Sequence, residues 1–272
     1  MTHFNLLIIG GDAAGMAAAS QARRIDSSIT IGALEKGEYI SYAACGLPYY
    51  IGGEIKDYRS LLIVEKDEFI TKRNIQVITE AEAIGADLRE KSIQARTENG
   101  ETVYTYDKLV IATGSSAALP PIKGTDLPGV MILKDMEDGI KIRKHIETAK
   151  PGSAIIIGGG LIGLELAEAF VRNSIGVTII EKAEAVAAAF STEMRTYIKG
   201  VLEKHDVKLI TGAGVSAISP SGAGLSVATD KGEYSADFVI VSTGVKPGTG
   251  FLKETGIDML PNGALIVDEK CR

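Results

Sequence analysis

The same short pattern occurs twice in this chain, 148 residues apart, and it constrains the fold more than any other feature. Each copy joins an apolar run of strand length to a glycine-rich turn, at residues 6–15 and 154–163. Helices of mainly small residues are expected next, over 16–24 and 164–173, and a second β-branched run then ends in Glu35 or Glu181. Strand, turn, helix and strand in this order form the mononucleotide-binding half of a doubly wound sheet. The repeat therefore predicts an α/β protein with two Rossmann-like domains.

Further strands suggest where the two domains divide. Apolar runs at 109–114 and 238–244 both end in Thr-Gly, and each is expected to add a strand to one domain. Alternating residues predict antiparallel strands at 92–95, 102–106 and 225–229, so each domain is expected to have three layers with an antiparallel excursion. Prolines and glycines between 120 and 129 mark a connection. We therefore expect a first domain at 1–114, completed by 245–272, and an inserted second domain at 115–244.

The composition narrows the class of protein. The 272 residues are 45% hydrophobic and 24% charged, which suits one large or two medium soluble domains. The net charge of −6 is interspersed, which argues against a nucleic-acid partner. The apolar run 6–9 is too short to span a bilayer, so no membrane partner is expected and a cytoplasmic location is favoured. The two cysteines, Cys45 and Cys271, do not form the framework of a disulfide-rich secreted protein.

The second glycine turn matches a dinucleotide-binding fingerprint. Gly158, Gly160 and Gly163 have the spacing that permits a tight turn, close approach of a pyrophosphate and close packing of the helix. The pyrophosphate is expected at the helix N-terminus, where free N–H groups and the positive dipole end favour an anion. Glu181 can accept hydrogen bonds from an adenosine ribose, and its charge favours NAD(H) over a 2′-phosphate. The alternative is a glycine-rich turn that serves only packing.

The first glycine turn departs from this fingerprint at one position. Asp12 stands where the second turn has Gly160. A carboxylate facing a pyrophosphate is unfavourable unless the side chain turns away or caps the helix N-terminus. Glu35 nevertheless ends the second strand as a nucleotide site requires.

Cys45 lies in an aromatic-rich run at 39–50, between the two nucleotide units. Pro48 suits the first turn of a helix, so Cys45 is expected at a helix N-terminus, where the dipole favours a thiolate. A lone cysteine in this setting suggests electrons passing from a nicotinamide, through a flavin, to sulfur. The alternative is a small buried apolar side chain.

These turns and the cysteine run resemble the FAD- and NAD(P)-dependent pyridine nucleotide–disulfide oxidoreductases, over the whole length. The closest resemblance is to the single-cysteine branch of coenzyme A-disulfide reductases and persulfide or polysulfide reductases. Tyr50 stands where two-cysteine reductases carry their second cysteine, and Ala13 where NADH peroxidases and oxidases typically carry histidine. One departure is Ala44, where the coenzyme A-disulfide reductase form usually has asparagine, and this removes one polar contact near the thiol.

The resemblance implies a glutathione-reductase-like fold, with FAD on the first unit and NAD(P)H, by preference NADH, on the second. It implies an enzyme, a FAD-dependent NAD(P)H:disulfide oxidoreductase that reduces a coenzyme A disulfide, persulfide or polysulfide bound at the catalytic Cys45. The residues expected to bind the cofactors are Gly10, Asp12, Ala13, Ala14, Gly15, Glu35, Lys36, Ala112, Thr113, Gly114, Gly158, Gly160, Leu161, Ile162, Gly163, Glu165, Glu181, Thr243 and Gly244.

The resemblance also assigns substrate contacts. Gln21, Arg24 and Ser41 match polar positions that contact coenzyme A in the family. Arg23 and Arg24 offer charge to a coenzyme A phosphate, although a solvated helix face is the alternative. No metal site is expected, because the histidines at 3, 145 and 205 lack metal-ligand spacing.

The family pattern continues beyond Arg272 with a flavin-binding aspartate turn and an interface domain that supports a homodimer. We therefore expect an incomplete FAD domain, no interface domain and an uncertain oligomeric state. A truncated chain is the favoured explanation, and a split gene product or a natural short form are the others. Two alternative functions stay open: an NADH oxidase or peroxidase that uses a Cys45 sulfenate, or a nucleotide-binding module without turnover.

Overall fold

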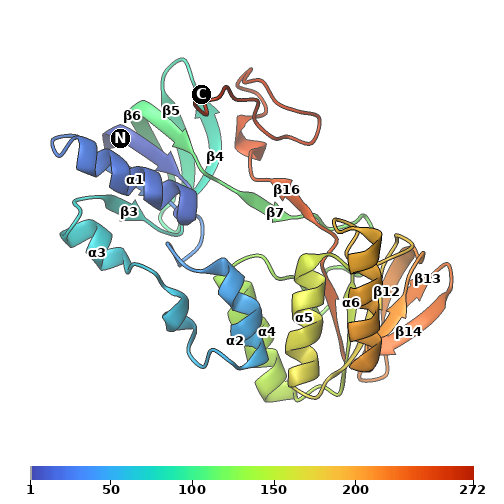
Figure 1. The fold of residues 1–272 in the computed structure, drawn as a ribbon. Helices are drawn as coiled ribbons and strands as arrows, with labels where there is room; N and C mark the ends of the chain where they lie inside the picture. Colours follow the sequence, from blue (N-terminus) through green and yellow to red (C-terminus); the bar gives the residue numbers. More distant parts are fainter. Residues whose placement is uncertain (1) are drawn as a thin grey trace. The chain divides into compact units, whose positions relative to one another are not determined.

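The structure is a computed structural model that describes residues 2–272, and it divides into two compact units (Figure 1). The first unit contains residues 2–43, Arg59–Ser116 and Lys246–Arg272. The second contains Ala44–Tyr58 and Ala117–Val245. This grouping differs from the sequence-based division at 44–58, because the helix in that segment packs against helices of the second unit. Cys45 therefore belongs structurally to the unit with the second glycine turn.

The first unit is built on a six-stranded sheet in the order β3-β2-β1-β6-β5-β4. β1 pairs in parallel with β2 and β6, and β2 with β3, whereas β5 is antiparallel to both β4 and β6. The strands are β1 (Thr2–Ile9), β2 (Ile31–Leu34), β3 (Gln76–Ile78), β4 (Glu82–Asp87), β5 (Ser92–Thr97) and β6 (Gly100–Ile111). The order of the parallel strands is that of a nucleotide-binding fold.

Alternation along β1 divides the core of the first unit between two faces. Ile8 packs with Met16 and Phe69, which come from helices α1 (Ala13–Ile25) and α3 (Lys66–Thr71). Leu7 and Ile9 belong to a different cluster, which includes residues of β5 and β6. Phe251, next to the fully buried Leu252 in the short helix η3 (Gly250–Leu252), packs against that second cluster. The segment after 245 therefore returns to the first unit.

The second unit contains a five-stranded parallel sheet in the order β11-β10-β9-β15-β8. A three-stranded antiparallel sheet, β12-β13-β14, forms a further layer. The parallel strands are β8 (Val130–Met131), β9 (Ser153–Ile157), β10 (Gly176–Ile180), β11 (Lys208–Ile210) and β15 (Phe238–Val241). The antiparallel strands are β12 (Val215–Ser221), β13 (Gly224–Thr229) and β14 (Gly232–Ala236).

Side chains on the two faces of β15 hold these layers together. Val239 and Val241 belong to the same buried cluster as Val227 of the antiparallel sheet. On the other face, Phe238 packs edge-on against Phe170 of one helix and His145 of another, each with ring centroids 5.2 Å apart. These helices are α5 (Leu161–Arg172) and α4 (Met136–Ala149), and α6 (Thr192–Lys204) completes the unit. The fold is thus α/β with two three-layer units, as the repeat predicts.

The short connecting elements include the helix that carries the cysteine run. It comprises η1 (Ala44–Gly46) and α2 (Leu47–Gly52), and η2 (Tyr58–Leu61) follows. Strands β7 (Ser115–Ala117) and β16 (Val245–Pro247) pair with each other as a two-stranded sheet. They contain the points at which the chain passes from the first unit to the second and returns.

Four of the expected elements differ from the structure in an informative way. The strands expected at 102–106 and 109–114 are one strand, β6, which pairs antiparallel with β5 along its first half and parallel with β1 along most of its length. Thr113 and Gly114 lie beyond its end. Helices α1 and α5 begin three residues before the positions expected, because each starts directly at its glycine turn.

Over the described residues, none of the helices combines the length and the apolar character that crossing a bilayer requires.

The N-terminus of α4 contains a partly buried carboxyl group with a pH-dependent effect on stability. The Asp135 side chain accepts a hydrogen bond from the Asp138 N–H, and Asp138 accepts one from the Lys134 N–H. Burial, together with the nearby Asp135 charge, raises the pKa of Asp138 to about 6. Between the ordinary carboxyl pKa and this value the folded state binds more protons than the unfolded state, so this group's contribution to stability falls as pH rises.

We therefore expect Asp138→Asn to raise the melting temperature at pH 7 relative to the wild type and to have a smaller effect at pH 4. An asparagine oxygen still accepts from Lys134, while the buried charge is gone. Calorimetry across this pH range measures the difference. Asp135→Asn, which keeps a good N-cap, should shift the transition to lower pH. A melting temperature lowered equally at all pH values in Asp138→Asn would contradict the assignment.

Candidate functional site

The second glycine turn brings three backbone segments into direct contact. Gly158 follows β9 with a φ of +112°, and a Cβ there would collide with the carbonyl oxygen of Ser242. A Cβ on Gly163 would collide with the carbonyl oxygen of Gly158. Glycine is needed at both positions because α5 and the end of β15 approach this turn more closely than any side chain permits. The N-terminus of α5 is thereby placed at the C-terminal edge of the parallel sheet.

Backbone hydrogen bonds hold the Glu181 carboxylate against this turn. One carboxylate oxygen accepts from the Gly159 N–H at 2.6 Å and the other from the Ala183 N–H at 2.7 Å. Backbone donors therefore orient the acid at the end of β10, and they use only part of the hydrogen-bonding capacity of its two oxygens. A ribose hydroxyl can bind to the remaining positions.

A cavity of about 780 Å³ opens at this edge of the sheet. Its size lies within the range of roughly 300–1,000 Å³ that is typical of cofactor pockets. Most of the residues expected to bind a cofactor in the second unit line it: Gly158, Gly160, Leu161, Ile162, Glu181, Thr243 and Gly244. Gly163 lies beneath the turn, and Glu165 is exposed on α5 without lining the cavity. Partial desolvation and the nearby Glu168 raise the pKa of Glu165 above its usual range.

Sequence reasoning missed several walls of this cavity. Pro120, Ile122 and Lys182 line it, as do Gly214 and Val215 from the antiparallel layer. Lys182 had a visible signal, because the pair Glu181-Lys182 repeats the pair Glu35-Lys36 of the first copy. The other walls come from the connection after β7 and from the start of β12, where spacing alone gives no signal.

The first glycine turn is built in the same way. Gly10 has a φ of +110°, and a Cβ there would collide with the Ala112 carbonyl oxygen, while one on Gly15 would collide with that of Gly10. The Glu35 carboxylate accepts from the Gly11 N–H at 2.7 Å and the Gly37 N–H at 2.8 Å. The sequence repeat is therefore also a repeat of these contacts.

Asp12 fits this turn without facing into it as an unpaired charge. Its backbone angles, φ −97° and ψ −157°, resemble those of Gly160, φ −79° and ψ −175°. It occupies the N-cap position of α1 but makes no capping hydrogen bond, and its Oδ1 accepts from the Tyr42 N–H at 3.3 Å. The side chain is therefore directed toward the segment at 41–42, in agreement with the expectation that it turns away or caps the helix.

The remaining expected contacts of the first unit surround this turn or lie near it. Ala13 and Ala14 are exposed in the first turn of α1, and Lys36 is exposed beside Glu35. Thr113 is close to Gly10 and to Gly248, whose N–H donates to the Gly114 carbonyl at 3.0 Å. In the second unit, the corresponding Thr243 hydroxyl donates to the Ala118 carbonyl at 2.6 Å.

Cys45 lies in the 3₁₀ turn η1, directly before α2. Its thiol is free and exposed, so the alternative of a buried apolar side chain is wrong. Pro48 lies in the first turn of α2, as its residue type predicts. Tyr50 is buried and packs edge-on against Tyr58, whereas Tyr49 is exposed. The helix thus presents the cysteine at its N-terminal end while its apolar side chains are buried.

The three expected substrate contacts occupy two places in the first unit. Arg24 donates to the Gln21 Oε1 from Nε at 3.0 Å and from Nη2 at 2.6 Å, so these two side chains form an exposed pair on α1. Ser41, with a φ of +48°, donates its N–H to the Gly11 carbonyl at 3.0 Å. Arg23 is engaged differently, because its guanidinium donates to backbone carbonyls that include those of Arg73 and Asn74. A phosphate-binding role therefore suits Arg24 better than Arg23.

Within residues 2–272, no three or more His, Cys, Asp or Glu side chains are placed together so that they could hold a metal ion.

The comparisons with known proteins agree with this geometry. Residues 4–272 match the family model of the pyridine nucleotide-disulphide oxidoreductases, and the chain belongs to this family. It is 37% identical over 266 residues to a protein of Pyrococcus abyssi named NAD(P)H sulfur oxidoreductase (CoA-dependent), covering 97% of this chain and 59% of that protein. It is 32% identical, with the same coverage of both chains, to a protein of Methanocaldococcus jannaschii named NADH oxidase.

A solved structure shows the same fold. The structure described as a NAD-dependent persulfide reductase from A. fulgidus superposes with a TM-score of 0.93 at 36% identity, covering 98% of this chain and 51% of that one. The chain thus spans about half to three-fifths of the length of these relatives.

Gly158 and Gly160 of the second turn should respond differently to an added methyl group. Gly158→Ala forces an unfavourable φ and a backbone collision, which should cost about 1–3 kcal/mol or more of stability. Gly160→Ala should leave stability almost unchanged, because its added Cβ meets no atom within 4 Å. Thermal and urea unfolding of both variants check this contrast. Equal destabilisation would show that the turn does not make the close contact.

Proposed function

We propose that this chain is the nucleotide-binding part of a FAD-dependent NAD(P)H:disulfide oxidoreductase that reduces a sulfur substrate held at Cys45. The acceptor class is a coenzyme A disulfide, a persulfide or a polysulfide. The observation that carries this proposal is an exposed free thiol in a chain with two matched dinucleotide turns. The relatives named as sulfur oxidoreductase and persulfide reductase support it.

The residues of the first unit fit FAD. The cradle around Gly10 and Gly15 has no room for side chains, and Asp12 is turned toward the Tyr42 N–H. A pyrophosphate can therefore approach the backbone N–H groups at the start of α1 without meeting a bulky side chain or an unpaired carboxylate. Glu35, held by Gly11 and Gly37, would accept from the ribose. FAD, when bound, supplies a ring that accepts a hydride and donates electrons to sulfur.

The cavity of the second unit fits the pyridine nucleotide. Gly160 leaves the cavity open beside the turn, because no atom lies within 4 Å of where its Cβ would be, and Glu181 lies at the end of β10, where the adenosine ribose of a dinucleotide binds in such folds. The fixed carboxylate favours the two free hydroxyls of NADH over the 2′-phosphate of NADPH, because the negative charges would repel each other. Lys182 also lines the cavity, and its positive charge reduces this preference. It cannot accept a hydrogen bond from a ribose hydroxyl as Glu181 can.

Cys45 would act as the nucleophile of a thiol–disulfide exchange. Its thiolate attacks one sulfur of the substrate disulfide, the sulfur–sulfur bond breaks, and the first thiol leaves as a thiolate. The mixed disulfide then takes up two electrons, which originate from the pyridine nucleotide. The sulfur–sulfur bond between Cys45 and the substrate breaks, the Cys45 thiolate is restored and the second substrate sulfur leaves as a thiolate.

Arg24 suits a coenzyme A phosphate better than its neighbour Arg23 does. It is exposed, and its side-chain hydrogen bonds go to Gln21 rather than to an acid. Arginine forms strong, directional hydrogen bonds with phosphate oxygens.

Two exposed free cysteines suit a reducing compartment, so we propose that the protein is cytoplasmic. The homodimer of the family, and the identity of the two domains as FAD-binding and NAD-binding, stay predictions.

An NADH oxidase is the second candidate, and the relative of that name favours it. In this alternative, Cys45 cycles through a sulfenic acid instead of a mixed disulfide. Ala13 argues against it, since the residue offers no proton donor or hydrogen-bonding group at the start of α1.

The role of Cys45 can be tested with the FAD-reconstituted chain. Cys45→Ser should reduce NADH-dependent release of thiols from coenzyme A disulfide to background, because serine cannot form the mixed disulfide. Cys271→Ser, which removes the other exposed thiol, should keep wild-type turnover. Wild-type consumption of oxygen or peroxide without coenzyme A disulfide turnover would favour the oxidase, and NADH binding without any turnover would favour the binding module.

The nucleotide preference gives a second test. We expect the chain to bind NADH roughly tenfold more tightly than NADPH, which corresponds to about 1.4 kcal/mol. Glu181→Gln should narrow this difference, because the charge is lost while one acceptor oxygen stays. Gly160→Ala should weaken the binding of NADH and of NADPH equally, because the added methyl group protrudes into the cavity. Fluorescence titration measures the affinity of each of the three proteins for each of the two nucleotides, and tighter NADPH binding by the wild type would overturn the proposed role of Glu181.

A further inference from the structure

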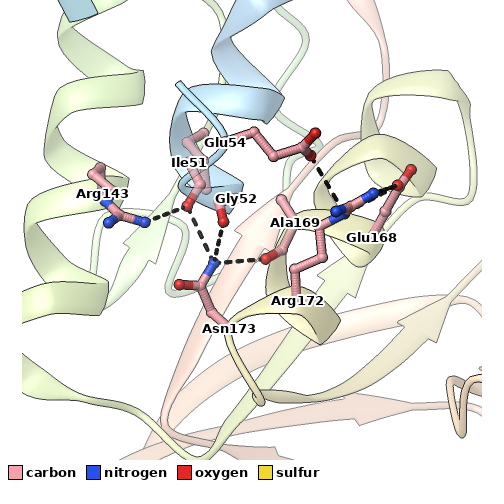
Figure 2. Close-up of polar contacts among 8 residues, drawn as sticks. All are labelled: Ile51, Gly52, Glu54, Arg143, Glu168, Ala169, Arg172 and Asn173. Atoms are coloured by element: carbon pink, nitrogen blue, oxygen red, sulfur yellow. Dashed lines mark hydrogen bonds and ion pairs between the residues drawn. The ribbon is translucent and has the colours of Figure 1, made fainter. Parts of the chain in front are cut away.

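Side chains of α4 and α5 hold the C-terminal end of α2, the helix that follows Cys45 (Figure 2). This helix has six residues, fewer than a helix needs for stability in isolation. Its position must therefore come from its packing against the second unit, to which the segment 44–58 belongs.

The end of α2 has two carbonyls that its own backbone cap does not satisfy. Gly53 is left-handed with a φ of +85°, and its N–H donates to Tyr50 while that of Glu54 donates to Tyr49. This is a Schellman motif, and it accounts for those two carbonyls. The carbonyls of Ile51 and Gly52 require other donors. Because Ile51 is fully buried, side chains of neighbouring helices are suited to provide them.

Arg143 supplies a charged donor from α4. Its Nη1 donates to the Ile51 carbonyl at 3.0 Å, and its Nε donates to Glu147 at 2.7 Å. The Arg143 side chain is only 19% exposed, so this charge-assisted hydrogen bond is shielded from water. A Cβ on Gly53 would lie 2.9 Å from Nη1, so the glycine also makes room for the guanidinium.

Asn173 supplies an amide donor from the end of α5. Its Nδ2 lies 3.3 Å from both the Ile51 and the Gly52 carbonyl oxygens and 2.8 Å from that of Ala169 (Figure 2). One amide group therefore bridges the last turn of α5 and the end of α2. The backbones approach closely here, since a Cβ on Gly52 would lie 3.4 Å from the Cα of Ala169.

The other end of α2 fits a gap in α4. Leu47, the first residue of α2, packs over Gly139, and a Cβ on that glycine would lie 2.7 Å from Leu47 Cδ2. The helix is therefore fixed at both ends by residues of the second unit. Cys45 precedes Leu47 by two residues, and its placement follows that of the helix.

The neighbouring ion pairs differ from these contacts in exposure. Arg172 pairs with Glu54 at 3.4 Å and with Glu168 at 2.9 Å, but its side chain is 49% exposed. Exposed pairs of this kind contribute little because water and salt screen them. The shielded donors of Arg143 and Asn173 therefore dominate the hold on α2.

We infer that Arg143 and Asn173 are positioning residues for Cys45, acting through the carbonyls of Ile51 and Gly52. The inference rests on the proposed function for its catalytic consequence, whereas the hold on α2 stands on the contacts alone. Loosening one end of a six-residue helix disturbs its whole length, because so short a helix has too few internal hydrogen bonds to persist on the packing of Leu47 alone. Cys45 then loses its fixed position, while the cavity for the pyridine nucleotide stays intact.

The test compares Arg143→Met and Asn173→Ala with the matched control Glu147→Gln. The control removes the ion pair of Arg143 but keeps its donor to Ile51. Hydrogen exchange over 47–54 should become roughly tenfold faster in the two test variants, the order expected for losing one shielded hydrogen bond, and stay unchanged in the control. Exchange in α6 serves as the internal reference. Arg143→Lys keeps a cationic donor, which makes it a conservative rescue that should restore most of the protection.

Turnover of coenzyme A disulfide by the FAD-reconstituted chain supplies the second readout. We expect kcat to fall roughly tenfold in Arg143→Met and Asn173→Ala, with the KM for NADH unchanged and with recovery in Arg143→Lys. Exchange over 47–54 equal to that of Glu147→Gln would overturn the inference whatever the activity, and so would unchanged kcat in a fully active wild-type background. If the wild type shows no sulfur turnover but exchange over 47–54 is still faster in the variants, the role of Arg143 and Asn173 in holding α2 stands. Only the proposed function is then overturned.

Discussion

The close approach of backbone segments at the two glycine turns is the constraint on which the rest of the structure depends. At each turn the helix begins against the carbonyl of the first glycine, and the adjoining strand end lies against the same residue. A side chain at Gly10, Gly15, Gly158 or Gly163 would force these segments apart. The same contact aims the N–H groups of α1 and α5 at the sheet edge and brings Glu35 and Glu181 within hydrogen-bonding distance of the turns. The packing of the turns and the proposed binding of a pyrophosphate therefore have a common origin.

The parts of the site that follow from local chemistry were predictable from sequence. Glycine spacing and the acid at the end of the second strand predicted both turns, because steric demands act on residues that are close in the chain. Contacts between distant segments were not predictable in this way. β6 is one strand with both an antiparallel and a parallel neighbour, and only its partners decide this. The walls of the cavity at Pro120 and Gly214 likewise come from segments that carry no nucleotide motif.

The role of Asp12 in the first turn becomes clear only when its hydrogen-bond partner, the Tyr42 N–H, is known. An aspartate at this position conflicts with a bound pyrophosphate unless its side chain turns away or caps the helix N-terminus. The structure has the N-cap position without the capping bond, and the carboxylate accepts from the Tyr42 N–H instead. Asp12 and the neighbouring Gly11 carbonyl thus both bind the segment 41–42. The departure from the fingerprint is therefore a link between the first turn and the start of the cysteine run.

Helix α5 connects the two chemical features of the second unit. Its first residues follow the nucleotide turn, and the residue after its last turn, Asn173, donates to the end of α2. A helix of 12 residues is about 18 Å long and behaves as a rigid rod. Helix α5 therefore contacts the cavity at one of its ends and α2, the helix that follows Cys45, at the other. An enzyme that moves electrons between a nucleotide and a thiol needs both groups in fixed places, and one rigid helix that contacts both the cavity proposed for the nucleotide and the support of the cysteine would meet part of that need.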